Sequence, residues 1–452
     1  MGGRAAVVGI DLGTSGVKVL VVASEDDGVV LGRGRAEYPV LVPSVGRAES
    51  EPGDWWRATC GAVREAVAAA PDADIAAVAV AGQMHGVVLA GGADGADGAG
   101  RSGPAGFAGS AADPVRPAIL WLDQRAAAEA DAYADLPPAL TRPLGNRPSP
   151  GMAGPILRWL VTHEPERVAA ARWALQPKDW LRLRMTGQAA TDPTDASGTL
   201  LFDLERDAWA AGLVAALGLP GGKLPPVRDS AAVAGALLAG PAAELGLPPG
   251  LPVVTGAADT AAALYAAGLG ADEAMLTLGS GGQWMVPEPA FAPVDGTNVF
   301  RAVGDGFFRL APLQNIGVTL NWVRTMLGVS WADLYDTAAR PARPDAPVFV
   351  PYLTPERWDP GATGAWTGLT LADQREDLLR SALDGVATLL RSRLDDLRAA
   401  GHDPRAVLLG GGGATHPAWR ALLEAALGLP LRAAASDWLT AAGAARLAAA
   451  AA

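Results

Sequence analysis

The chain has 452 residues, 50% of them hydrophobic and 19% charged, which is the composition of a folded protein long enough for two or three domains. Its net charge of -12 excludes a broad basic surface for nucleic acid or anionic membranes, so an anionic ligand would need backbone amides or a metal ion. The single cysteine, Cys60, excludes an intramolecular disulfide and fits a reducing cytoplasm. No signal peptide or membrane span is expected, because Asp, Arg or Gly interrupts every apolar stretch.

The first part of the chain alternates strands with a helix. Residues 5–24 predict two strands joined by a tight glycine turn, and residues 29–42 predict a third strand that completes an antiparallel meander. Residues 51–70 have the acidic start and apolar spacing of a helix, and residues 75–82 predict the next strand. This order favours an α/β fold. The Gly-, Ala- and Asp-rich segment 91–117 has no periodicity, and we expect it to form a surface loop without a functional role.

The opening pattern returns in the second half of the chain. Residues 7–22, VVGIDLGTSGVKVLVV, and residues 272–286, DEAMLTLGSGGQWMV, both contain an apolar strand, Leu-Gly, a hydroxyl residue and a second apolar strand. A repeat with so long a period indicates duplicated domains rather than a solenoid. Between the copies, a helical stretch interrupted by prolines leads to LPPGLPVVTG, which marks a junction. We therefore predict two domains, residues 1–249 and residues 250–452.

Both copies place glycine and hydroxyl residues at a hairpin tip. Such a tip leaves backbone N–H groups pointing outward, which suits phosphate oxygens, and Thr14, Ser15 and Ser280 add hydroxyl donors. Either turn alone is a common hairpin tip, but two copies favour a polyphosphate ligand. A third glycine run, 410–413, follows a strand and lacks the Lys-Ser/Thr of a Walker motif. It indicates either the close approach of a flat ligand or phosphate, or a tight turn.

Two carboxylates follow predicted strands. Asp11 ends the strand before the first hairpin tip, where it is placed either to hold a hydrated Mg²⁺ that bridges phosphates or to order the turn. Asp259 lies where the strand 253–256 gives way to a helix over 260–267, where it is placed either as a helix cap or for catalysis. The pattern by itself leaves both alternatives open.

Two further polar segments follow strands. The segment GQMHG places Gln83, Met84 and His85 where ligands of open α/β sheets gather, and a methionine face with an imidazole suits a polyol. The segment LWLDQR places Trp121 and Asp123 in the same way. The alternatives are a structural histidine and an Asp–Arg pair that orders its own loop.

These motifs resemble those of the FGGY family of sugar kinases over nearly the whole chain, and within that family they are most similar to the kinases of D-xylulose. The most specific segments are PKDWLRLRMTG and DASGT, which composition would not produce by chance. The segments GIDLGTSGVKVLV, GQMHG, LWLDQR, LGNRPSPGMAGP and VVTGAADTAAA occur in the family's order. The spaced C-terminal signature of the family is matched by Gly364, Trp366, Gly368, Leu369, Asp377, Leu378, Ser381, Ala382, Leu383 and Asp384.

The resemblance implies an α/β fold with two duplicated domains of the ribonuclease-H/actin type that face one another across an ATP and sugar cleft. It implies phosphate transfer from ATP to a small-molecule sugar, D-xylulose, to give D-xylulose 5-phosphate, with Asp259 as the general base and Asp11 as the residue for Mg²⁺ and the ATP phosphates. The implied sugar contacts are Gln83, Met84, His85, Trp121, Asp123, Asp259 and Thr260. The implied ATP contacts are Thr14, Ser15, Gly279 and Ser280 for the phosphates, and Gly411, Gly412 and Ala414 for the adenosine.

Thr260 departs from the family pattern, in which an asparagine usually follows the catalytic aspartate. A shorter side chain without an amide changes how the far hydroxyls of the sugar are read. The exact sugar therefore stays open, and the alternatives are a kinase for another ketose, polyol or sugar acid such as ribulose or gluconate, or a non-catalytic sensor of sugar and nucleotide. The presence of both Asp11 and Asp259 favours a kinase. The sequence also leaves the oligomeric state open, with a homodimer as one candidate.

Overall fold

The chain divides into two compact units. The computed structural model of the protein describes residues 3–24, 28–91, 112–341, 343–354, 356, 361–434 and 437–452. Unit 1 contains the chain up to Ala266 together with Phe300–Gly306 and Trp438–Ala452. Unit 2 contains Ala267–Val299 and Phe307–Asp437. The C-terminal segment of the chain thus belongs to the same unit as its first strands.

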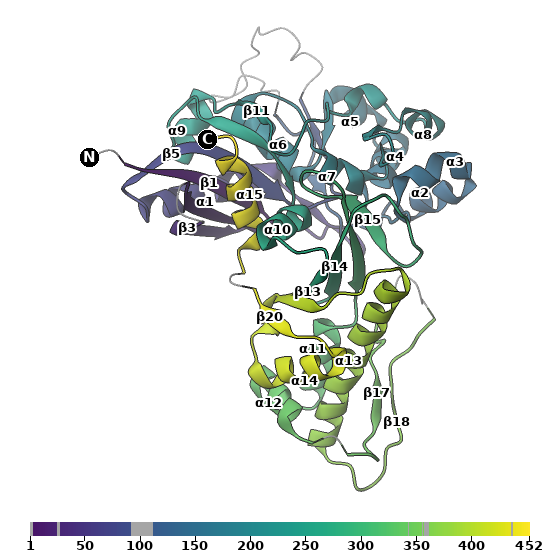
Figure 1. Ribbon diagram of the computed structural model, residues 1–452. Coiled ribbons are helices and arrows are strands. Elements are labelled where there is room, and N and C mark those ends of the chain that lie inside the picture. The colour runs from purple at the N-terminus through teal and green to yellow at the C-terminus, as the bar shows by residue number, and fades with distance from the viewer. Residues whose placement is uncertain are drawn as a thin grey trace. The chain divides into compact units, whose positions relative to one another are not determined.

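Unit 1 is built on a six-stranded sheet with the order β11-β12-β5-β1-β2-β3 (Figure 1). Strands β1 and β2 are antiparallel, whereas β1, β5 and β12 run parallel, so these three strands end at the same edge of the sheet. The strands are β1 (Arg4–Leu12), β2 (Gly16–Ala23), β3 (Val30–Glu37), β5 (Ala73–Gly82), β11 (Val233–Ala236) and β12 (Pro252–Ala258).

Helices cover both faces of this sheet, which is why its strands are rich in valine, alanine and glycine. Side chains alternate between the two faces along a strand. A Cβ at Gly9 would overlap the backbone of α15 (Leu439–Ala449), whereas Val8 and Ile10 on the other face share an apolar core with α1 (Pro52–Ala68). The helices therefore pack directly onto the sheet.

Unit 1 has a second apolar core, separate from the first core to which α6 (Pro177–Thr186) and α9 (Ala239–Leu245) belong. This core is centred on α4 and includes Leu157, Leu160, Leu201 and Leu213. Three short strand pairs, β4 with β7, β6 with β8 and β9 with β10, connect its segments. The remaining helices of unit 1 are α2 (Ala127–Asp131), α3 (Pro138–Thr141), α4 (Ala153–His163), α5 (Pro165–Ala170), α6 (Pro177–Thr186), α7 (Pro193–Ala196), α8 (Ala211–Ala216), α9 (Ala239–Leu245) and α10 (Asp259–Ala267); its remaining strands are β4 (Glu49–Ser50), β6 (Val88–Ala90), β7 (Ala118–Ile119), β8 (Trp173–Leu175), β9 (Phe202–Asp203) and β10 (Ala208–Trp209).

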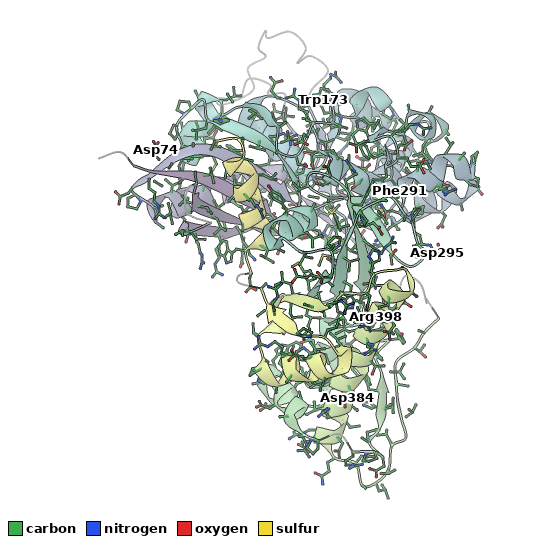
Figure 2. All side chains as sticks on the ribbon, in the orientation of Figure 1. Asp74, Trp173, Phe291, Asp295, Asp384 and Arg398 are labelled. Carbon is green, nitrogen blue, oxygen red and sulfur yellow. The ribbon has the colours of Figure 1, made fainter. Side chains whose placement is uncertain are left out.

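A second six-stranded sheet has the order β15-β16-β14-β13-β19-β20 and belongs to unit 2 except for the last two residues of β15. Its β13–β14 hairpin is antiparallel and its β13–β19 pair is parallel, as in the β1, β2 and β5 group of unit 1. Helix α13 buries an apolar face in the same core as β13 and exposes ion pairs such as Arg380 with Asp384, the latter labelled in Figure 2. The elements are β13 (Glu273–Leu278), β14 (Gly282–Glu288), β15 (Asn298–Arg301), β16 (Phe307–Leu313), β17 (Val348–Val350), β18 (Ala365–Thr367), β19 (Ala406–Gly410), β20 (Leu431–Ala433), α11 (Gly317–Met326), α12 (Trp331–Asp336), α13 (Arg375–Ala399) and α14 (Pro417–Leu427).

The predicted α/β class with two domains on related sheets is confirmed, as are the three-stranded meander, the first helix and the strand after it. Most of the predicted loop 91–117, namely residues 92–111, lies outside the described residues. The predicted boundary between residues 249 and 250 stays a prediction. In the described part of the chain, no helix has the length and apolarity needed to cross a membrane.

Candidate active site

Two carboxylates lie at the edge of the unit 1 sheet where β1, β5 and β12 end. Asp11 on β1 is opposite Ala81 on β5, and Ala81 is opposite Ala257 on β12. Asp259 follows two residues after Ala257 and is the first residue of α10. Because neighbouring strands are about 4.8 Å apart, the two aspartates project from backbone positions roughly 10 Å apart. The structure thus brings together the two residues for which the sequence predicted the central roles.

The two carboxylates have raised pKa values. Burial raises the pKa of Asp11 to about 7, the negative charge of Asp259 contributes to the rise, and Lys18 opposes it. Burial likewise raises the pKa of Asp259 to about 6, against the hydrogen bonds from Thr260. A pair of partly buried acids with pKa values close to neutrality is an arrangement suited to binding a cation or accepting a proton.

The hydrogen bonds of Asp259 leave one oxygen for a ligand. Its Oδ1 accepts hydrogen bonds from the backbone N–H of Thr260 at 2.6 Å and from the Thr260 hydroxyl at 3.1 Å. Within the described residues, no group donates a hydrogen bond to its Oδ2. The helix start therefore orients the carboxylate through Oδ1, and the cap and the catalytic alternatives are compatible with each other.

The segment after β5 packs against the β1–β2 hairpin tip and the DASGT segment of the sequence. The Gln83 side chain donates a hydrogen bond to the carbonyl oxygen of Gly13 at 3.2 Å. Nδ1 of His85 lies 2.7 Å from the Gly198 carbonyl oxygen, which can only accept, so this nitrogen carries the proton. A Cβ at Gly198 would come within 2.8 Å of the Met84 side chain and 3.0 Å of the His85 ring. The predicted segment 83–85 is therefore fixed by both neighbours.

His85 also has an uncommon backbone conformation. Its φ of 75° lies in the left-handed region, which a side chain other than glycine rarely adopts. Its ring contacts Phe300, with ring centroids 6.1 Å apart. Strained backbone of this kind is concentrated at functional sites. The conformation favours a role for His85 beyond packing.

Trp121 connects the second polar segment to the first hairpin. Its indole N–H donates a hydrogen bond to the Thr14 hydroxyl at 3.0 Å, and 38% of the residue is exposed. Ser15 at the same tip is exposed, and its carbonyl oxygen accepts the N–H of Tyr38. The predicted sugar contact Trp121 and the predicted phosphate contact Thr14 thus belong to one hydrogen-bonded group.

Asp123 has different surroundings from the other predicted sugar contacts. The residue is 1% exposed, and its two oxygens accept hydrogen bonds from the Ala48 N–H at 2.7 Å and from the guanidinium and backbone N–H of Arg125 at 2.8 to 2.9 Å. Arg125 also pairs with Glu49 at 2.6 Å. These contacts favour the alternative of an Asp–Arg pair that orders its loop.

The predicted nucleotide contacts of unit 2 surround the end of β13. Gly279 and Ser280 form the tip of the β13–β14 hairpin, and a Cβ at Gly317, the first residue of α11, would overlap the carbonyl oxygen of Gly279. Gly411 has a φ of 87°, and a Cβ there would overlap the backbone of Leu278. Gly412 and Ala414 belong to the short 3₁₀ helix that follows. The surface is therefore made of backbone, as the predicted contact with a phosphate or flat ligand requires.

Four residues of these surfaces were missed by reasoning from the sequence. They are Lys18, Tyr38, Phe300 and Gly317. Lys18 is the cross-strand partner of Asp11, and the Tyr38 hydroxyl donates a hydrogen bond to the Gly13 carbonyl oxygen. The register of the hairpin, counted outward from its glycine tip, could have identified Lys18.

Comparison with known proteins covers both units. The FGGY family of carbohydrate kinases, N-terminal domain, matches residues 6–94 and 107–266, and the C-terminal domain of the same family matches residues 274–452. A xylulose kinase of Escherichia coli (strain K12) is 34% identical over 425 residues, which are 92% of this chain and 84% of that relative. The crystal structure of xylulose kinase from Rhodospirillum rubrum is similar with a TM-score of 0.86 and 28% identity, covering 98% of this chain and 90% of that one. The crystal structure of gluconate kinase from Lactobacillus acidophilus has a TM-score of 0.86 at 23% identity, covering 98% and 88% of the two chains, and shows the shared fold alone.

Proposed function

This chain belongs to the FGGY family of carbohydrate kinases, and we propose that it transfers the γ-phosphate of ATP to D-xylulose, giving D-xylulose 5-phosphate and ADP. The observation that carries the proposal is Asp259, a carboxylate held by a helix start through one oxygen, with a pKa raised by burial to about 6. The similarity to kinases of D-xylulose over most of the chain supports the choice of sugar.

Asp259 acts as the general base in this proposal. Its Oδ2 accepts the proton of the terminal sugar hydroxyl as that oxygen forms a bond to the γ-phosphorus and the bond from phosphorus to the bridging oxygen of ADP breaks. A carboxylate with a pKa near 6 is ionised at neutral pH and still basic enough to take up the proton. Phosphoryl transfer needs little besides this base, correct positioning and neutralised charge.

Asp11 fits the requirements of a Mg²⁺ site. Mg²⁺ takes oxygen ligands, keeps several waters, and binds through one or two carboxylates in addition to substrate phosphates. Asp11 supplies a carboxylate directly before the glycine hairpin tip. Its raised pKa means that the negative charge of the carboxylate is disfavoured where it lies, and a bound cation would stabilise that charge. Bound Mg²⁺ would neutralise charge on the phosphates. Lys18, opposite Asp11, adds a fixed positive charge on the same side.

The remaining residues bind the two substrates. Gln83, Met84, His85, Trp121 and Thr260 contact the sugar, while Asp123 keeps the Trp121 loop in place through Arg125. Thr14, Ser15, Gly279 and Ser280 are the proposed phosphate contacts, and Gly411, Gly412 and Ala414 are the proposed adenosine contacts. The homodimer and the cytoplasmic location stay predictions.

A panel of sugars tests the proposal. ADP release would be measured with D-xylulose, L-ribulose, D-ribulose, gluconate and glycerol at saturating ATP and Mg²⁺. We expect the highest kcat/KM for D-xylulose. A higher value for gluconate or glycerol would contradict the choice of sugar. Tight ATP binding with no turnover on any sugar would instead support a sensor.

A further inference from the structure

Strand β12 carries a β-bulge directly before Asp259. Val254 is opposite Ala79 and Ala257 is opposite Ala81, so β12 uses one residue more than β5 over the same interval. The bulge contains Gly256, whose φ is 85° and where a Cβ would overlap the carbonyl oxygen of Val80. Bulges bend a strand and redirect the residues that follow them. The direction in which the chain leaves the sheet at Asp259 is therefore set by this bulge.

The backbone groups around the bulge are bonded to groups outside the strand ladder. The Arg182 guanidinium donates a hydrogen bond to the Thr255 carbonyl oxygen at 2.6 Å. The N–H of Gly256 donates to the Ser230 carbonyl oxygen at 3.0 Å. The N–H of Ala258, the residue before Asp259, donates to the Thr194 hydroxyl at 2.8 Å. Each of these contacts holds the bulge in one conformation.

The Thr194 hydroxyl is itself fixed in direction. It donates its proton to Oδ2 of Asp192 at 2.6 Å, so a lone pair is left to accept the Ala258 N–H. Oδ2 of Asp192 also accepts the Ser230 hydroxyl at 2.7 Å, and Oδ1 lies 2.9 Å from Nζ of Lys178. Thr194, Asp192 and Lys178 are all 0% exposed. Water does not compete with these bonds.

The charges behind Asp192 form a buried cluster. Lys178 lies 2.6 Å from Asp179 and 3.3 Å from Asp195, and Arg182 lies 3.0 Å from Asp179. A buried ion cluster is a poor source of stability, because removing the charges from water costs about as much as their attraction returns. Here the cluster has a second effect, since Arg182 bonds the backbone of the bulge directly and the Lys178–Asp192 pair reaches Ala258, the residue after the bulge, through the Thr194 hydroxyl.

We propose that Thr194 is a positioning residue for Asp259, and that its hydroxyl, held by Asp192, Ser230 and Lys178, fixes the end of β12 so that the carboxylate meets the sugar hydroxyl. This inference rests on the proposed role of Asp259. It predicts that Thr194 affects the chemical step rather than substrate binding, since Thr194 is buried and bonds the backbone before Asp259.

The test compares Thr194→Val, Thr194→Ser and Thr59→Val in the full-length enzyme. Thr59 is a matched control because it is also 0% exposed and, among the described residues, its hydroxyl bonds only the Trp55 carbonyl oxygen within α1. We expect Thr194→Val to lower kcat about 10- to 100-fold, with KM for the sugar and for ATP within about threefold of wild type, because small misplacements of a reacting group have effects of this size. Thr194→Ser keeps both hydrogen bonds, and we expect it to restore kcat to within about threefold.

Wild-type kcat in a folded Thr194→Val, an equal loss in Thr59→Val, or a change in KM alone would overturn the inference. If Thr194→Val does not fold, Ser230→Ala removes one of the bonds to Asp192, and we expect a roughly threefold to tenfold loss of kcat at unchanged KM; wild-type kcat in that variant would count against the inference. Asp259→Asn in the same assay separates the two proposals. Full turnover in Asp259→Asn would contradict the role of Asp259 as the base. If Asp259→Asn loses turnover while Thr194→Val keeps wild-type kcat, only the positioning role of Thr194 is contradicted.

Discussion

The two six-stranded sheets place different residues at the same position of the same hairpin. In unit 1, Asp11 stands before Leu12 and the glycine tip, and in unit 2, Thr277 stands before Leu278 and the glycine tip. Each hairpin also has a parallel strand beside it, β5 in one unit and β19 in the other. The duplicated scaffold therefore presents a carboxylate in unit 1 and a neutral hydroxyl residue in unit 2. In the proposed function, this difference places the metal and proton chemistry in unit 1 and leaves unit 2 with a neutral backbone surface.

The hairpin tips differ in length as well. Leu12 pairs with Val17, which leaves a four-residue tip, whereas Leu278 pairs with Gly282, which leaves a three-residue tip. A Cβ at Gly281 would come within 2.6 Å of the Leu313 carbonyl oxygen, so the second tip has no room for another hydroxyl side chain there. The loss of one hydroxyl in the second copy thus follows from the close approach of β16.

The carboxylates of the two units also differ in the direction of their pKa shifts. Burial raises the pKa of Asp11 and Asp259 in unit 1. Hydrogen bonds and arginine partners lower the pKa of Asp373 and Asp395 in unit 2. Of these four acids, the two in unit 1 are held at a cost in stability, whereas the two in unit 2 have partners that stabilise their charged form. Four predictions test this contrast.

The largest expected effect is that of Asp259→Asn. Removing a general base typically lowers the rate by about 10²- to 10⁴-fold, and we expect a fall of that size in kcat with little change in KM. Asp74→Asn is the matched control, because Asp74 is exposed near the opposite end of β5 (Figure 2). ADP release measures both. Equal activity of the two variants would show that Asp259 matters no more to the reaction than an exposed aspartate at the opposite end of the sheet.

Asp11→Asn should have the next largest effect. We expect about a 10²-fold fall in kcat/KM for ATP and a higher Mg²⁺ concentration for half-maximal activity, because one carboxylate ligand is lost. Thr277→Val, at the equivalent position of unit 2, should change kcat/KM less than about threefold. Titration of Mg²⁺ at fixed ATP checks both variants. The same Mg²⁺ dependence in Asp11→Asn as in wild type would show that Asp11 does not serve the metal.

Gly411→Ala should weaken ATP binding more than Gly412→Ala. At Gly411 a side chain meets a φ of 87° and the backbone of Leu278, whereas a Cβ at Gly412 has no described atom within 4 Å. We expect KM for ATP to rise about tenfold in Gly411→Ala, with a loss of about 1 to 3 kcal/mol in the free energy of unfolding. Isothermal titration with ATP and thermal unfolding distinguish the variants. If Gly412→Ala is the more damaging, the nucleotide lies against a different part of the turn.

The smallest expected effect concerns stability and pH. Because the pKa of Asp259 is raised from 3.8 to about 6, the folded protein holds a proton between about pH 4 and 6 that the unfolded chain has released, so this group lowers stability as pH rises through that window. We expect Asp259→Asn to be about 1 to 2 kcal/mol more stable than wild type at pH 8 and no more stable at pH 4.

Asp373→Asn in unit 2 should change stability in the opposite direction. The pKa of Asp373 is lowered by hydrogen bonds from Thr370 and Arg343, so its contribution is present at pH 8 and is lost as the pH falls through its folded pKa. Denaturant unfolding at the two pH values measures both variants. The same sign of change at pH 8 would mean that the two units do not differ in how they hold their acids.

Much of the site was predictable from the sequence because its signals are local. The glycine tips, Asp11 after one strand and Asp259 before a helix follow from strand alternation and turn chemistry within a few residues. The sequence also left open whether Asp123 binds sugar or pairs with Arg125, and only the described hydrogen bonds favour the pair.

The remaining features depend on contacts between distant residues. Thr194 bonds Ala258 across 64 positions of the chain, and Phe300 reaches the His85 ring from a segment between two parts of unit 2. The bulge in β12 was not predicted, although Gly256 within an apolar run is a signal for one. Such features follow from packing and register, which local patterns do not specify.

The most direct test of the central claim is the identity of the product. Wild-type protein and Asp259→Asn would be incubated with D-xylulose, ATP and Mg²⁺ and followed by phosphorus NMR. We expect the wild type to form one phosphomonoester on the terminal carbon of the sugar for each ATP consumed, and Asp259→Asn to form it at least about 10²-fold more slowly. Release of inorganic phosphate without a sugar phosphate, or equal rates for the two proteins, would contradict a sugar kinase that uses Asp259 as its base.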